Sequence, residues 1–171
     1  MYNKDFFFNI FLIIVLALAQ SFIFNHVNFL GSYQPYIYVV FVLFFPPYQN
    51  RYLLVFLAFI LGLMVDVLEY TGGIHAFSLT FIAYYRNLII KLLSGKVNFE
   101  MEYFNFNTFS ISQWIFYLLI LIFFHHSILL VLENFKFTGI LKVLSNALIS
   151  SGITFIFVII YKILFKNKIS V

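Results

Sequence analysis

Six ionisable side chains interrupt or border the apolar stretches of this sequence, and they are the groups through which it could carry out chemistry. They are Asp66, Glu69, His75, His125, His126 and Glu133. Ionisable groups within a membrane span are costly, so each one raises a functional hypothesis. All six lie toward the same outer end of the spans predicted below. We therefore expect them to form a candidate polar network at that end.

The sharper chemical hypotheses for this set are a proton relay, a metal site, and an acid–base pair in a lipid-modifying enzyme. His125 and His126 are adjacent, so on a helix they point about 100° apart and do not hold one ion as an i, i+4 pair would. The chain has no cysteine, and no nucleophile motif or phosphate-binding loop accompanies the carboxylates. The pattern favours a hydrogen-bond network that fixes helix packing. We expect a protein that is not an enzyme, with no catalytic residue, no metal and no cofactor.

The composition places this network in a membrane protein. Of 171 residues, 64% are hydrophobic and 9% are charged, which is too little charge to cover a water-facing surface. The net charge of +4 comes from basic residues scattered singly at the ends of apolar runs. This distribution indicates membrane topology and no nucleic-acid partner. We expect a single transmembrane domain over residues 1–171, with short loops.

Six apolar runs must position the polar groups, and they predict an all-α membrane protein. The first run is more typical of a span than of a cleaved signal peptide, because residues 22–24 prolong its hydrophobicity. The second run has only ten residues between Pro35 and Pro46. It is either a tilted helix that begins near Phe29 or a re-entrant segment covered by protein. We expect a compact bundle of about six transmembrane helices, or five plus a re-entrant segment. The runs are 6–24, 36–45, 52–68, 74–93, 111–132 and 141–165.

The basic residues predict the orientation of the bundle. With six spans, eight of the ten basic residues lie on the side of both termini, and Lys136 and Lys142 lie on the other side. Basic residues are enriched in cytoplasmic loops, so both termini are expected in the cytoplasm. If the second run is re-entrant, Lys4 changes side and the count becomes seven to three. The rule therefore orients the last four spans better than the first two.

Arg86 and the aromatic residues are expected near the membrane surface. Arg86 lies near the cytoplasmic end of the fourth run, where its side chain can snorkel to lipid phosphates or helix termini. The alternative is a pairing with a partner subunit, or with Glu100 or Glu102. Trp114 and the 12 tyrosines fit an interfacial aromatic belt.

Small residues predict where helices approach closely. They form patches on the first, fourth and sixth runs, at Ala17 with Ser21, at Ser78 and Ala83, and over 145–152. We expect these patches to be packing seams. We also expect the interface with a partner to use the first or the sixth run, together with the hairpin of the third and fourth runs.

The turn between the third and fourth runs has its own physical interpretation. Gly72 and Gly73 permit positive φ, so the two runs can form a tight helical hairpin. Asp66 then lies near the first turn of the fourth run, where free backbone N–H groups and the helix dipole favour an anion. We expect Asp66 to cap or brace this hairpin.

The same stretch resembles the signature of the MreD family of rod shape-determining membrane proteins. A span ends in Gly-x-x-x-Asp, a tight turn follows, Gly-x-His-Ala opens the next span, and Ala-Tyr lies near the far end of that span. The bulky 69–71 segment departs from the small polar turn often found there. The resemblance is carried by Gly62, Asp66, Gly73, His75, Ala76, Ala83 and Tyr84.

The resemblance implies a non-enzymatic component of the cell-elongation complex in the bacterial inner membrane. Such a protein binds an MreC-like bitopic scaffold and supports peptidoglycan synthesis. It works indirectly with an MreB-like filament, a SEDS glycosyltransferase and a class B penicillin-binding transpeptidase. The resemblance further implies a fold similar to the substrate-binding subunits of energy-coupling-factor transporters. A vitamin-binding subunit of such a transporter is the alternative function, although the expected outer loops are short for a ligand lid.

Overall fold

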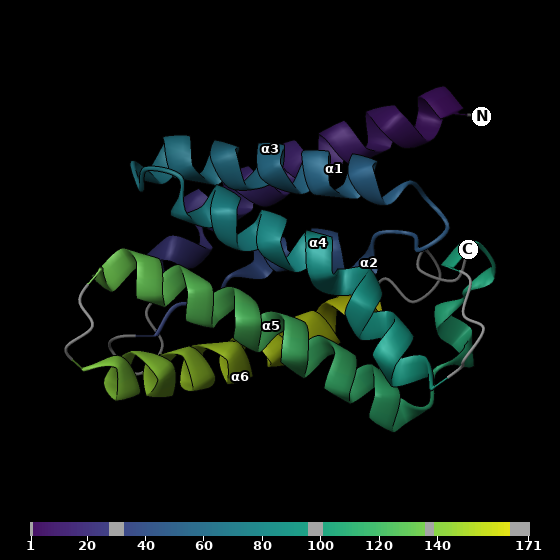
Figure 1. Cartoon of the computed structure of the whole chain (residues 1–171). Coiled ribbons are helices and arrows are strands. Elements are labelled where there is room, and N and C mark those ends of the chain that lie inside the picture. Colours follow the sequence, from purple (N-terminus) through teal and green to yellow (C-terminus); the bar gives the residue numbers. More distant parts are fainter. Residues whose placement is uncertain (1, 28–32, 96–100, 136–138, 165–171) are drawn as a thin grey trace.

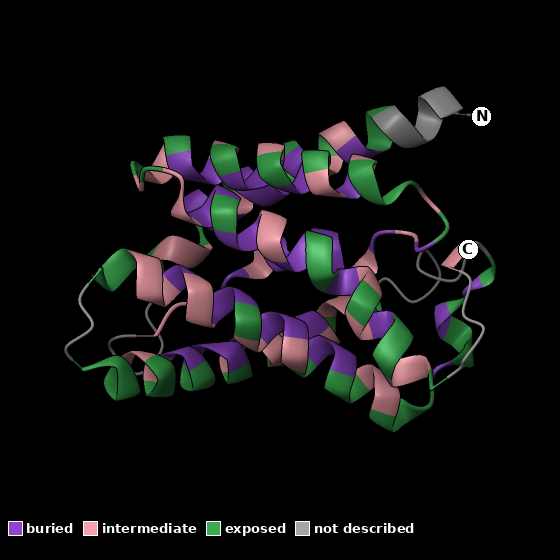
Figure 2. Ribbon diagram, in the orientation of Figure 1, coloured by how far each residue is buried: buried purple, intermediate pink, exposed green. Residues whose placement is uncertain are grey.

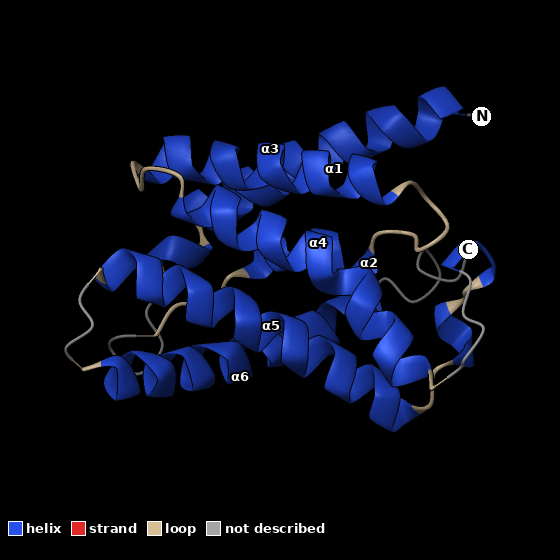
Figure 3. Cartoon of the chain, viewed as in Figure 1, coloured by secondary structure: helices blue, strands red, loops and turns tan. Residues whose placement is uncertain are grey.

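The computed structural model describes residues 2–27, 33–95, 101–135 and 139–164, and it describes side chains in these ranges except those of residues 2–6 and 102. Helices joined by loops make up these ranges, with no β-strand among them (Figure 3). The elements in chain order are α1 (Tyr2–Phe22), η1 (Phe24–His26), η2 (Ile37–Val39), α2 (Val40–Phe44), α3 (Arg51–Glu69), α4 (Ile74–Ser94), η3 (Met101–Tyr103), η4 (Phe106–Thr108), α5 (Ile111–Asn134) and α6 (Ile140–Leu164).

Five of the described helices, α1, α3, α4, α5 and α6, are long and apolar enough to cross a membrane. The all-α prediction is confirmed, and these helices indicate a multi-pass membrane protein. Helices α3 and α4 form one antiparallel hairpin, and α5 and α6 form another (Figure 1). Helix α4 packs on α5, and α1 packs on α3, so the two hairpins and α1 form one continuous bundle.

The second apolar run differs from both alternatives predicted for it. It contains the short η2 and α2 instead of one full helix. It also does not return to the side from which it came. Tyr36 packs against His75 at the start of α4, whereas the Phe45 carbonyl bonds to Arg86, eleven residues further along that helix. The two ends of the run are therefore about 16 Å apart along α4. We call residues 33–45 the crossing segment.

Side chains from α1 and α6 satisfy the irregular backbone where the crossing segment begins. The Gln20 amide donates to the Pro35 carbonyl at 3.1 Å and accepts from the Ile37 N–H at 2.8 Å. The Tyr36 N–H donates to the Thr154 hydroxyl at 3.1 Å. Backbone that leaves regular helix at membrane depth must be satisfied within the protein. Gln20 is 1% exposed, so α1 is an integral part of this packing.

Arg86 and Tyr117 do the same where the crossing segment ends. Arg86 donates to the Phe45 carbonyl and to the Tyr117 hydroxyl, and Tyr117 donates to the Leu43 carbonyl at 2.8 Å. The guanidinium also lies over the Phe106 ring, 5.5 Å from its centroid. Arg86 is 1% exposed, so it does not reach lipid phosphates at the surface. The other expected partner, a helix terminus, is found: Arg86 bonds to the carbonyl at the end of α2, inside the bundle.

The crossing segment reverses the direction of the chain between α1 and α3. In Figure 1, α1 and α3 both run from right to left. The crossing segment, which lies between them in the sequence, brings the chain back to the right. The first turn of α1 and the last turn of α6 therefore lie toward the same end of the bundle. We call this end, which also holds residues 101–109, the loop end, and the opposite end with the α3–α4 turn the turn end. The cytoplasmic location of the loop end stays a prediction.

Gly62 brings α3 and α4 into backbone contact near the turn end. A Cβ atom at Gly62 would lie 2.5 Å from the Ala76 Cα and 2.7 Å from the Ala76 nitrogen, well inside normal contact distance. Gly72 and Gly73 in the turn have φ angles of 71° and 102°, as predicted from their lack of a side chain. The hairpin thus depends on glycine for its close approach and for its turn.

Burial confirms one expectation about helix faces and corrects another (Figure 2). Ala17, Ser78 and Ser151 are 0%, 0% and 6% exposed, so these small residues lie in packing seams within the chain, as predicted. The partner interface on the first or sixth run stays a prediction. Tyr38 and Tyr117 are both 0% exposed, so they do not belong to an interfacial belt. Both tyrosines are hydrogen-bonded inside the bundle, because a buried phenol needs a polar partner.

Candidate functional site

Asp66 is the centre of a hydrogen-bonded cap at the turn end. Its Oδ1 accepts from the His75 N–H at 3.1 Å and its Oδ2 from the Ala76 N–H at 2.8 Å. The Thr71 hydroxyl donates to Oδ1 at 2.6 Å. Backbone N–H groups in the first turn of a helix have no acceptor within that helix. Asp66 therefore makes the contacts predicted for a cap, although it reaches α4 from α3 and the N-cap position itself is Gly73.

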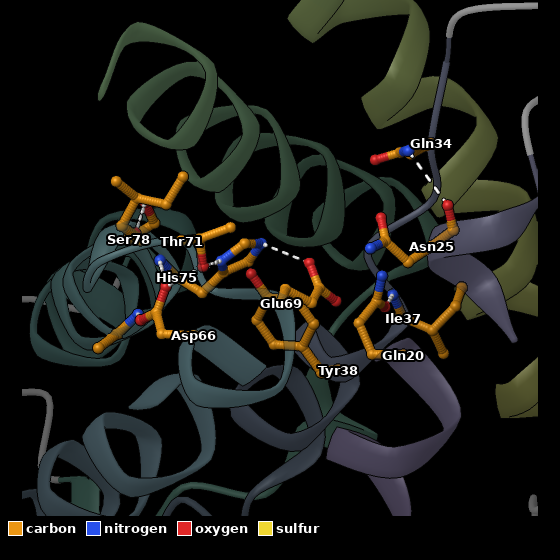
Figure 4. Close-up of polar contacts among 12 residues, drawn as sticks. Gln20, Asn25, Gln34, Ile37, Tyr38, Asp66, Glu69, Thr71, His75 and Ser78 are labelled. Carbon is orange, nitrogen blue, oxygen red and sulfur yellow. Dashed lines mark hydrogen bonds and ion pairs between the residues drawn. The ribbon is translucent and has the colours of Figure 1, made fainter. Parts of the chain in front are cut away.

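His75 lies between two carboxylates (Figure 4). Its Nδ1 is 3.0 Å from Asp66 Oδ1, and its Nε2 is 3.7 Å from Glu69 Oε2. The side chains of all three residues are almost fully inaccessible. The structure thus brings together three of the six predicted network residues, and they tie the last turn of α3 to the first turn of α4.

Two tyrosines of the crossing segment fill the space between the histidines. The Tyr36 ring centroid lies 5.9 Å from that of His75, 6.0 Å from His125 and 5.1 Å from His126. The Tyr38 ring lies 5.8 Å from His75, and the Tyr38 hydroxyl is 2.9 Å from His125 Nε2. These rings meet edge to face, which is a favourable arrangement for aromatic pairs. The crossing segment therefore connects the histidine of α4 with those of α5.

His126 takes part in a chain of hydrogen bonds between α5, α6 and the crossing segment. Its Nδ1 lies 2.8 Å from the Ile122 carbonyl, so this nitrogen carries the proton. In a neutral imidazole Nε2 is then an acceptor, and the Thr154 hydroxyl donates to it at 2.9 Å. The same hydroxyl accepts from the Tyr36 N–H. Every donor in this series of hydrogen bonds has an acceptor, and the series fixes the relative position of α5, α6 and the crossing segment.

Glu133 is the predicted network residue that stands apart. It is exposed in the last turn of α5, and no hydrogen bond or ion pair found among the described residues joins it to the other five. We refer to Tyr36, Tyr38, Asp66, Glu69, Thr71, His75, His125, His126 and Thr154 together as the polar core.

The geometry of the polar core is that of a structural brace. A relay of the Ser-His-Asp type needs the nucleophile on one imidazole nitrogen and the carboxylate on the other. Here the Thr71 hydroxyl and Asp66 both contact Nδ1 of His75. Among the described residues, no three histidine or acidic side chains converge as ligands of one metal ion. What the arrangement does chemically is to satisfy helix ends and crossing backbone with fixed hydrogen bonds.

Four residues of the polar core were missed from the sequence: Tyr36, Tyr38, Thr71 and Thr154. The signal for the tyrosines was the length of their run, because ten apolar residues between prolines are too short to span as a helix and must be covered by protein. Thr71 is five residues after Asp66, within reach across the turn. Thr154 had no signal, since its partners lie on two other elements, the crossing segment and α5.

The remaining residues of the family resemblance lie away from the cap. Ala83 is buried, and Tyr84 is 52% exposed with its ring 5.0 Å from the Arg51 guanidinium. Both are nearer the loop end than the cap is. Of the two acids proposed as partners of Arg86, Glu100 lies outside the described residues, as does the side chain of Glu102.

Comparison with protein families, with curated proteins and with solved structures finds no match for this chain.

Proposed function

We propose that this protein is a non-enzymatic membrane component of a bacterial cell-elongation complex. The proposal follows the resemblance of its signature residues to those of the MreD family. In this proposal it binds an MreC-like bitopic scaffold in the inner membrane and so supports peptidoglycan synthesis and cell shape. The observation that carries the proposal is the α3–α4 hairpin. Gly62, Asp66, Gly73, His75 and Ala76 all take part in closing this one unit.

The hairpin supports a binding role because it presents a rigid turn at the turn end. The Asp66 cap and the Gly62 contact fix both helices, while Tyr70 in the turn is 94% exposed with a left-handed φ of 57°. An exposed aromatic ring on a fixed backbone loses little conformational entropy on binding, so it is a good anchor for a partner. In this proposal Tyr70 contacts the scaffold.

The alternative, a vitamin-binding subunit of an energy-coupling-factor transporter, would use a pocket at the same end. The space between the three histidines is filled by the Tyr36 and Tyr38 rings, and hydrogen bonds join His125 to Tyr38 and His126 to Thr154. A ligand there would have to displace two buried tyrosines. The filled polar core therefore favours the scaffold role.

The experiment is copurification from native membranes in mild detergent, followed by mass spectrometry. Recovery of an MreC-like protein and wall-synthesis enzymes is expected, and depletion of the protein is expected to round the cells. A Tyr70→Ser variant should recover several-fold less scaffold. Tyr103→Ser, which removes an 80% exposed tyrosine at the loop end, is the matched control and should recover the normal amount. Recovery of a paired ATPase module with a coupling subunit would instead support the transporter.

A further inference from the structure

A groove between α3 and α4 runs along the outside of the hairpin toward the loop end. Its part nearer the turn end is a hollow of about 630 Å³. Three residues of α3 and seven residues of α4 and its N-cap line it: Val55, Phe59, Leu63, Gly73, Ala76, Phe77, Thr80, Phe81, Tyr84 and Tyr85. Phe59 and Leu63 are 43% and 40% exposed, and Phe77 and Tyr84 of α4 are 57% and 52% exposed. In a membrane this apolar hollow faces the hydrocarbon of the bilayer.

A second hollow, of about 540 Å³, lies at the loop end, and basic and amide side chains are among its lining residues. Arg51 and Lys91 line it together with the side-chain amides of Gln49 and Asn87. Arg51 and Lys91 are exposed, and the two amides are half-buried.

Residue spacing on α3 and one ring contact place the two hollows next to each other. On α3, Arg51, Val55, Phe59 and Leu63 follow one another at intervals of four residues, so they share one face. Tyr84 belongs to the apolar hollow, and its ring lies 5.0 Å from the Arg51 guanidinium in the basic hollow. A cation over an aromatic ring is held in place, so Arg51 is fixed at the junction.

We propose that this groove binds one anionic glycerophospholipid, with its phosphate headgroup in the basic hollow and an acyl chain along the apolar hollow. Charge and polarity argue for this occupant. Guanidinium and ammonium groups recognise phosphate oxygens, and the amides of Gln49 and Asn87 add hydrogen-bond donors. A basic cluster at the end of a membrane helix that continues into an apolar groove matches the two-part chemistry of a phospholipid.

The site differs from the one that the sequence suggested for lipid. Arg86 was the expected lipid contact, but its guanidinium is hydrogen-bonded inside the bundle, to Tyr117 and to the end of the crossing segment. Arg51 and Lys91 lie at the same end and keep their charges at the surface. The inference does not depend on the proposed scaffold role, since it concerns the purified chain and lipid alone.

The test is native mass spectrometry of the full chain in mild detergent during titration with dioleoylphosphatidylglycerol or dioleoylphosphatidylcholine. The anionic lipid is expected to bind at least about tenfold more tightly, and removing one basic residue should weaken it about fivefold. Arg51→Gln with Lys91→Gln should therefore weaken it about 30-fold. Lys142→Gln, at an exposed lysine of the turn end, is the control for Lys91→Gln and should have no effect.

Further arms of the same titration distinguish the occupants. Inorganic phosphate at millimolar concentration should not displace the lipid, because phosphate lacks the acyl chain. Glu100 and Glu102 flank Met101, which also lines the basic hollow, so Glu100→Gln with Glu102→Gln should keep or strengthen binding. Equal affinity for the two lipids, full binding by the double basic variant, displacement by phosphate, or weaker binding without the two acids would each overturn the proposal. A partner helix crosslinked to Leu63→Cys, with no lipid retained, would also overturn it.

Discussion

One carboxylate, that of Asp66, serves four donors at once. It accepts from two backbone N–H groups of α4, from Thr71 and from the His75 ring. Carboxylates shared in this way hold a helix start more firmly than a serine or threonine cap, because hydrogen bonds to an ionised group are the stronger kind. The cost of losing Asp66 should therefore exceed that of losing an ordinary surface acid.

We predict that Asp66→Ala lowers the free energy of unfolding by about 1–2 kcal/mol, because it leaves the His75 and Ala76 N–H groups without their acceptor. Thermal or denaturant unfolding in mild detergent measures the loss. Glu133→Gln removes an exposed carboxylate from the same end of the bundle and should be neutral. An Asp66→Ala protein as stable as the wild type would mean that the cap contributes nothing to the hairpin.

Arg86 provides a second prediction at the residue scale. Its guanidinium donates in two directions, to the Phe45 carbonyl and to the Tyr117 hydroxyl. Arg86→Lys keeps the charge but loses the planar fork, so we expect a loss of about 1–3 kcal/mol in unfolding free energy. Arg51→Lys, the same change at an exposed position, is the control and should leave the unfolding midpoint unchanged. Equal midpoints for the two variants would contradict this role of Arg86.

At the scale of elements, the α3–α4 hairpin is closed by a glycine contact that tolerates no added atom. Gly62→Ala would place a methyl group 2.5 Å from the Ala76 Cα, so the helices must move apart. Overpacking of this kind costs about 1–3 kcal/mol. We expect a lower unfolding midpoint and a hairpin that proteases cut more readily near residue 70.

Gly152 provides the matched control for that variant. It also lies within a membrane helix, α6, but a Cβ there would meet nothing within 4 Å. Gly152→Ala should be neutral or slightly stabilising, because alanine is the better helix former. If Gly62→Ala behaves like Gly152→Ala, the close approach of α3 and α4 is not a source of stability.

At the scale of the whole molecule, the distribution of basic residues predicts on which side each loop of α3 to α6 lies. The chain has no cysteine, so single cysteines can report sidedness without background. We predict that a membrane-impermeant maleimide labels Tyr70→Cys on intact cells, and labels Asn107→Cys only after permeabilisation. Tyr70 is in the α3–α4 turn and Asn107 in η4 at the opposite end of the bundle. Labelling of both cysteines from one side would contradict the prediction that α4 crosses the membrane. Labelling of Asn107→Cys on intact cells, with Tyr70→Cys protected, would mean that the bundle has the opposite orientation.

The features predicted well from the sequence are those with a local cause. Glycine at 72 and 73 and a carboxylate four residues before the turn at 70 determine the hairpin through backbone freedom and the free N–H groups of a helix start. The features predicted wrongly depend on which side of an apolar helix faces inward. Tyr117 and Ser151 lie on helices that are apolar all round, so periodicity does not separate the lipid face from the core face. Arg86 was misplaced for another reason, because its partner is a backbone carbonyl that no side-chain pattern reveals.

The crossing segment has a consequence for how the protein is made. A run of ten apolar residues is too short to enter the membrane as an independent helix. The hydrogen bonds that satisfy its backbone come from Gln20, Arg86, Tyr117 and Thr154, and the last of these residues is synthesised 118 residues after Tyr36. We therefore expect the segment to complete its packing only after α6 has emerged. A chain truncated before Thr154 would leave the Tyr36 N–H without its acceptor.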